Sequence, residues 1–362
     1  MRRFIRKYIL PLLLSILVTS CFTDFDPGIQ SDPVLCMSSL ITEGDSIKVS
    51  LTHTWAWTDS KIIEVASPHP SSEYNPAILV RDGVVRLYVN DEYEETLRLE
   101  SYVSDYLWNA DYPWIMTGYV YYQADYIPKS GDRLRLEAES AEYGSASAEV
   151  IVPEKVEIDT VEYTVSNYSE SVTTSTMTYG MNLNISAWFE DPSESVNYYM
   201  FKTSSSGYVY ESDDESIRSV ESVTFADVSE EPLFTEHVSA LDHALGETSG
   251  YSLFSDRQIS GKRYPLHIRL EDLEYYIRNQ DTGPELGKGY VSLDLYSISS
   301  SYYRHVISIW AANDGIVGSL GSIGLADPVF TASNVSTGAG VVAAATKCSY
   351  RLSLEEIIND MQ

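Results

Sequence analysis

Cysteine and basic residues are both scarce in this chain. Its 362 residues include three cysteines, and 24 Lys and Arg stand against 53 Asp and Glu, which gives a net charge of -29. A balance this acidic repels a phosphate backbone, so nucleic acid is not an expected partner. It also repels anionic membrane surfaces, so charge is not what would hold this protein to a membrane.

The usual catalytic and metal-binding motifs are missing as well. The chain has no Gly-x-Ser-x-Gly elbow, and no Lys-Ser/Thr follows the glycines of residues 315–324 to grip a phosphate. His237 and His243 lack the spacing of a zinc-binding helix, and the acidic run 211–215 lacks the central glycine of a calcium loop. We therefore expect no enzyme activity, no cofactor and no metal site. Local hydrogen bonds are the expected role of His53, His69, His267 and His305.

Residues 1–20 have the three-part pattern of a secretory signal peptide. Four basic residues lie in the first seven positions, residues 9–18 are mainly apolar, and small residues precede Cys21. The apolar run is about half of the roughly 20 residues that a membrane-spanning helix needs. The end of the leader resembles the bacterial lipobox, which implies cleavage before Cys21 and acyl chains such as palmitate on that cysteine. An ordinary signal peptide with a chance cysteine nearby is the alternative.

The residues after Cys21 give an expected location. Asp24 and Asp26 follow the cysteine closely, as in the surface-export signal that this segment resembles in Bacteroidetes lipoproteins. We expect residues 21–29 to be a tether to the outer membrane, and both the cell-surface and the periplasmic face stay open. Cys36 and Cys348 remain as thiols; buried, unpaired thiols are the default prediction, and a disulfide is the alternative that export permits.

Short alternating runs of apolar and polar residues predict a mainly β protein. Several half-buried strands at this spacing favour an immunoglobulin-like β-sandwich over residues 30–153. Turns are expected at 90–92 and 142–145, where Asn, Asp and Gly gather, and Pro153 closes the region. The strands expected within it cover residues 47–52, 84–89, 96–99, 134–138 and 146–152.

A second β-rich domain, with one or two helices, is predicted over residues 154–362. The Ser- and acid-rich stretch 203–232 is expected to be a long loop or a hairpin insertion. Aromatic and aliphatic residues at helical spacing predict a helix near 299–313. Ser353 and Glu356 have capping-box spacing, so a short final helix and a terminal strand both stay open. The strands expected here start at Val156 and cover residues 182–189, 264–270 and 290–295.

Aromatic residues are abundant, with 28 Tyr and six Trp, and they are dense between residues 102 and 126. Exposed Tyr and Trp give a binding surface rigid contact area with a polar handle. The alternative is that they fill the sandwich, because strands favour aromatic residues. The segment 108–114 is expected to be a loop, which makes a ligand or partner surface the functional interpretation. The candidate residues are Tyr106, Trp108, Tyr112 and Trp114.

An ordered set of short phrases resembles a family of Bacteroidetes outer-membrane lipoproteins catalogued as a domain of unknown function. The resemblance covers essentially the whole chain after the leader, and where it expects an aromatic after the glycine pair the chain has Val341-Val342. It implies a cell-envelope lipoprotein, often beside TonB-dependent transporters, and no catalytic residues. The phrases are Pro128–Asp132, Val152-Pro153, Phe189–Pro192, Asn197–Tyr199, Phe254–Lys262, Tyr302-Tyr303, Pro328-Val329 and Ser333–Val341.

Three functions follow from these observations, in order of preference. The first is a non-catalytic accessory or binding lipoprotein of an outer-membrane transport system, whose partners are the membrane, through its lipid, a TonB-dependent transporter and a glycan or peptide. The second is a surface adhesin or fimbria-like subunit, although no convincing Arg-based processing site precedes the first strands. An envelope hydrolase is the weakest alternative, because no catalytic motif supports it.

Overall fold

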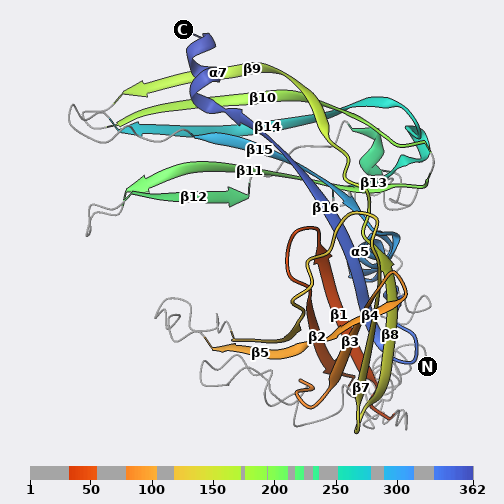
Figure 1. Cartoon of the computed structure of the whole chain (residues 1–362). Helices are drawn as coiled ribbons and strands as arrows, with labels where there is room; N and C mark the ends of the chain where they lie inside the picture. Colours follow the sequence, from red (N-terminus) through yellow and green to blue (C-terminus); the bar gives the residue numbers. More distant parts are fainter. Residues whose placement is uncertain are drawn as a thin grey trace, which may run out of the picture.

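A computed structural model describes residues 32–54, 79–103, 118–172, 176–193, 195–210, 217–223, 231–235, 252–278, 289–313 and 330–361. Within these ranges the chain is mainly β, as predicted, and forms two layered bodies that share one long strand (Figure 1). None of the described helices is long and apolar enough to cross a membrane.

The first body is a β-sandwich. One layer contains β1 (Leu35–Thr42), β2 (Lys48–His53), β6 (Gly118–Gln123) and β5 (Arg98–Val103), and the other has the order β4-β3-β7-β8. Alternate residues of each strand point inward, as in the buried Leu35, Met37 and Ile41 of β1. The second layer consists of β4 (Glu92–Thr96), β3 (Val84–Val89), β7 (Arg133–Ser140) and β8 (Gly144–Ile151).

Turn chemistry places these strands as the sequence predicted. Asn90 and Asp91 have positive φ angles of 53° and 74° and join β3 to β4, and Gly144 with φ 82° follows the turn that ends β7. One expected strand, residues 96–99, was wrong. The chain leaves one layer at Thr96 and enters the other at Arg98, and the buried Leu97 between them donates its N–H to the Val85 carbonyl.

The second body packs a three-stranded antiparallel sheet against the continuation of the large sheet. The three strands are β9 (Ile158–Val172), β10 (Thr176–Glu190) and β14 (Arg263–Arg278), in the order β14-β10-β9. Facing them are β12 (Ile217–Val223), β11 (Tyr198–Tyr210), β15 (Tyr290–Ile298) and β16 (Ala339–Ser353), with the short β13 (Leu253–Ser255) beside β11. Phe189, Tyr199 and Phe254 are fully buried between the layers.

Three further elements complete the second body. The stretch 203–232 contains a hairpin of β11 and β12, which decides between the loop and the hairpin that the sequence left open. The helix expected near 299–313 is confirmed as α5 (Ser300–Asn313), and the tail ends in α7 (Leu354–Met361), where Ser353 Oγ accepts the Glu356 N–H at 3.3 Å. Single-turn 3-10 helices lie at Pro232–Thr235 and Asp256–Gln258.

Strand β16 joins the two bodies. Its first half runs parallel to β1, from Ala339 opposite Cys36 to Ala345 opposite Thr42. Its second half pairs antiparallel with β15, so a single strand lies in both cores (Figure 1). The division predicted at Pro153 stays a prediction, as does the immunoglobulin-like topology, but residues 335–344 contribute Val335, Val342 and Ala344 to the core of the first body.

Candidate functional site

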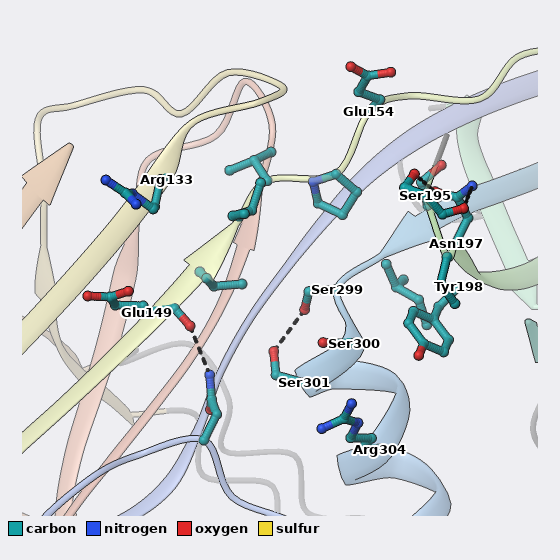
Figure 2. A pocket seen from close by; sticks show the side chains of 18 of the residues that line it. Arg133, Glu149, Glu154, Ser195, Asn197, Tyr198, Ser299, Ser300, Ser301 and Arg304 are labelled. Carbon is teal, nitrogen blue, oxygen red and sulfur yellow. Dashed lines mark hydrogen bonds between the residues drawn. The ribbon is translucent and has the colours of Figure 1, made fainter. Parts of the chain in front are cut away.

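A pocket of about 660 Å³ lies where the two bodies meet (Figure 2). Four parts of the chain build it: Gly131 and Arg133 at the start of β7, the end of β8 with the connection at 152–154, Pro192 with residues 195–198 that enter β11, and the start of α5 beside the segment 332–334. Its polar and charged lining includes Arg133, Glu149, Glu154, Ser195, Asn197, Ser299, Ser300, Ser301, Arg304 and Asn334.

The first turn of α5 is fixed at the pocket wall by Ser299. The Ser299 hydroxyl accepts the N–H groups of Tyr302 at 3.4 Å and Ala344 at 3.0 Å, and its backbone N–H donates to the Ala344 carbonyl at 2.8 Å. Ser299 is therefore both the N-cap of the helix and a bridge to β16. The arrangement turns the amide-rich end of the helix and the Arg304 side chain toward the pocket (Figure 2).

The two arginines of the pocket differ in their surroundings. Arg133, at the start of β7, forms an ion pair with Asp91. Arg304 is exposed, and among the described residues no acidic side chain lies within ion-pair distance of it. Arg304 is therefore the cation of the pocket that a bound group can engage without displacing a partner.

A buried hydrogen-bond network holds Pro192 and residues 195–198. The Tyr199 hydroxyl donates to Asp191 Oδ1 at 2.5 Å, and Gly261 N donates to Asp191 Oδ2 at 3.0 Å. Asn197 donates its backbone N–H to Asp256 Oδ2 at 2.8 Å and its amide to Asp191 Oδ1 at 3.3 Å. Both carboxyl groups are almost wholly buried, so the network sets the shape of this wall rather than offering a contact to ligand.

Burial also shifts the titration of this network. Desolvation raises the pKa of the Asp256 carboxyl, and the neighbouring Asp191 charge raises it further. Desolvation and the bond to Asp191 raise the pKa of the Tyr199 hydroxyl well above its ordinary value. The hydroxyl therefore stays protonated as a donor.

Asn334 holds the opposite wall in place. Its side chain forms two hydrogen bonds with Val342 of β16, donating to the carbonyl at 2.8 Å and accepting the N–H at 2.9 Å, and donates to the Glu149 carbonyl at 3.3 Å. Such a pairing mimics a strand neighbour. Segment 332–334 therefore bridges β8 and β16, and the pocket depends on residues 185 positions apart.

The structure does not describe the predicted aromatic surface. Tyr106, Trp108, Tyr112 and Trp114 lie outside the described residues, as does Cys21. Two aromatics of the same dense region are structural. Tyr122 is 3% exposed in the first core, and the Tyr126 hydroxyl donates to Asp132 Oδ2 at 2.7 Å. Burial, and after it this hydrogen bond, raises the pKa of Tyr126 to about 12.

The described histidines and cysteines have local roles. Nδ1 lies within hydrogen-bond distance of Thr54 O in His53, of Ser186 Oγ in His267 and of Ala332 O in His305. The other three histidines, His69, His237 and His243, lie outside the described residues. Cys36 and Cys348 are both free, and the part of the chain that the structure covers has no group of three metal-ligating side chains. Burial and Glu157 raise the pKa of the Cys348 thiol to about 11, so it is an unreactive core residue.

Sequence reasoning missed Ser299, Arg304 and Asn334 as pocket residues. One signal was present: the phrases of the resemblance include Asp191-Pro192, Asn197, Gly261 and Ser333-Asn334, and the structure brings these distant segments together at the junction. Their shared location was not derivable from a single sequence, because it depends on β16 pairing with β1.

Fold and site together define a mainly β protein of two joined bodies with a polar pocket at their junction. The chain belongs to the family described as Domain of unknown function (DUF4249), whose model matches residues 23–351. A search of curated proteins found no match.

Proposed function

We propose that this protein is a lipid-anchored binding protein of the outer membrane that acts beside a TonB-dependent transporter and catalyses no reaction itself. The observation that carries the proposal is the junction pocket, which combines about 660 Å³ of space with the exposed Arg304 and the serine hydroxyls at the start of α5. Pockets with a few fixed polar groups are the usual form of a recognition site.

The anchor and the pocket suit each other in this proposal. A lipid on Cys21 would hold the chain at the membrane, and the strong negative charge of -29 would keep the body away from anionic headgroups. The pocket would then meet an extracellular or periplasmic loop of the transporter, or the glycan or peptide that the transporter imports.

Copurification from native membranes tests the proposal. The full chain, tagged at its C-terminus and solubilised in mild detergent, is expected to recover an outer-membrane transporter, identified by mass spectrometry. Arg304→Glu is expected to reduce that recovery at least about tenfold, since a charge reversal within a buried contact costs several kcal/mol. Arg81→Glu is the matched control, because Arg81 is also exposed and lies outside the pocket.

Equal recovery by both variants would refute a role of the pocket in partner binding. Recovery of no transporter by the unmodified chain would refute the accessory function itself.

A fimbria-like subunit is the second candidate, and one feature favours it. Strand β16 pairs in parallel with one edge of β1. Donor strands make this kind of pairing between neighbouring subunits. In an assembly, β16 of one copy would complete the sandwich of the next. Electron microscopy of purified protein would show polymers under this alternative, and monodisperse single particles would count against it.

A further inference from the structure

A second cavity, of about 610 Å³, lies on the outer face of the large sheet beside α5. It shares no lining residue with the junction pocket. Strands β1, β2 and β16 form its floor, and β6 and α5 contribute its two sides. We call this cavity the sheet groove.

The floor of the sheet groove carries hydroxyl groups. Ser38 of β1 lies opposite Ser50 of β2 on one side and opposite Val341 of β16 on the other. Leu40, which is 51% exposed, lies opposite Ala343 in the same way. Among the described residues neither the Ser38 nor the Ser50 hydroxyl has a protein hydrogen-bond partner, so both are available to a ligand.

Aromatic rings stand at both sides of this floor. Tyr121 belongs to β6 and Tyr302 to α5, and both line the sheet groove. The ammonium group of Lys48 lies 5.2 Å from the centre of the Tyr121 ring, which holds it at the edge of the floor. Tyrosine rings present flat apolar faces with a polar end, which is the surface on which the C–H face of a sugar ring packs.

The charge of the sheet groove is opposite to that of the whole chain. Its lining contains the cation Lys48 and no aspartate or glutamate, whereas the full sequence carries a net charge of -29. Within the described part of the chain Lys48 forms no ion pair. A cation left open in an otherwise acidic protein favours a ligand that brings its own negative charge.

His305 adds a hydrogen-bond acceptor. Its Nδ1 lies 2.7 Å from the Ala332 carbonyl, and because a carbonyl oxygen only accepts, Nδ1 carries the proton. In the neutral ring Nε2 is then an acceptor, which suits a sugar hydroxyl.

We propose that the sheet groove binds an acidic saccharide. The sugar ring would pack against Tyr121 and Tyr302, its hydroxyls would bond with Ser38, Ser50 and His305, and its carboxylate or sulfate would pair with Lys48. This site is independent of the junction pocket and of the transporter partnership, and each stands if the other fails.

Isothermal titration calorimetry on the soluble chain without its leader tests the proposal. The probes are short oligosaccharides of galacturonate, alginate and chondroitin sulfate, the methyl-esterified galacturonate oligomer, and an oligoglutamate peptide. At least one acidic saccharide is expected to bind, the uncharged ester to bind about tenfold more weakly or worse, and the peptide not to compete.

Two variants and a control locate the binding. Lys48→Gln is expected to weaken affinity about tenfold or more, and Ser38→Tyr, which fills the floor from an exposed position, to abolish it. Lys202→Gln is the matched control, because Lys202 Nζ lies 5.7 Å from the Tyr296 ring in the same kind of contact outside the sheet groove. Thermal unfolding confirms that each variant folds.

Three results would overturn the assignment. The first is that no acidic saccharide binds at millimolar concentration. The second is that Lys48→Gln and Lys202→Gln weaken saccharide affinity equally. The third is that the oligoglutamate peptide binds as tightly as the saccharides, which would make the groove a peptide site.

Discussion

Asp256 is a carboxyl group buried beside a second one, Asp191, and its pKa is raised mainly by burial. A group whose pKa is higher in the folded state stabilises the fold while it is protonated, and the stability falls as the pH rises through that pKa. Asp256→Asn keeps an acceptor for Asn197 N–H and cannot ionise. The unfolding free energy of this variant, measured with urea, is expected to improve relative to the natural chain as pH rises above the ordinary range of an aspartate. A difference in unfolding free energy between the variant and the natural chain that stays constant with pH would contradict a raised pKa of Asp256.

Gly340 marks the closest approach of two backbones. It has φ 107°, and a Cβ at this position would lie 2.2 Å from the Met37 carbonyl oxygen. Gly340→Ala is therefore expected to lower the unfolding free energy by about 2 kcal/mol or more, because it combines backbone strain with a clash against a paired strand.

The control for Gly340 is Gly44, which has φ 83° and open space around its Cβ position. Gly44→Ala should cost only the conformational strain, about 1 kcal/mol. Equal losses in thermal unfolding would show that the approach of β16 to β1 does not need a glycine.

Residue roles were predictable where chemistry is local. Asn90 and Asp91 had turn character in the sequence, and the spacing of Ser353 and Glu356 was that of a helix cap, which they form at the start of α7. The roles of Asp191 and Asn334 were not predictable, because their partners, Gly261 and Glu149, lie far away in the chain.

At the scale of elements, β16 completes the first sandwich from the far end of the chain. It covers β1, and just before it Ser336 exchanges both backbone hydrogen bonds with Ser147 of β8. The segment 335–344 thus closes the gap between the two layers on that side. Residues 32–153 alone would expose this edge and the apolar surface that Val335, Val342 and Ala344 cover.

Fragment complementation measures this dependence. The fragment 32–153 is expected to lack a cooperative unfolding transition, and a peptide of residues 331–346 added in excess is expected to restore one, followed by circular dichroism. The same peptide with Gly340→Ala should complement poorly. A fragment that unfolds cooperatively without the peptide would refute the role given to β16.

The strands with clear alternation followed from the sequence, because alternation and turn residues are local signals, whereas β1 and β6 were not predicted. β3 and α5 lie within a residue of the expected ranges. The break at Leu97 was missed, since Thr96 and Arg98 continue the alternation while the chain changes layers. The pairing of β1 with β16 had no local signal, because parallel neighbours are chosen by tertiary packing.

At the scale of the whole molecule, the proposed tether depends on one residue that lies outside the described ranges. Cys21→Ser is expected to abolish incorporation of labelled palmitate and to move the protein from the membrane fraction to the soluble fraction, because two or more acyl chains are needed for a stable anchor. Cys36→Ser is the control, since Cys36 is a free thiol in β1. Label retained in the Cys21 variant would contradict the lipobox interpretation.

Photo-crosslinking in intact cells measures whether the junction pocket receives a partner. A crosslinking amino acid replaces Ser195 or Ser300 at the pocket, and Ser169 or Glu271 on the exposed surface of the second body. A crosslink to one outer-membrane transporter is expected from the two pocket positions and none from the other two. Crosslinks of equal yield from all four positions, or from the control positions alone, would contradict this expectation.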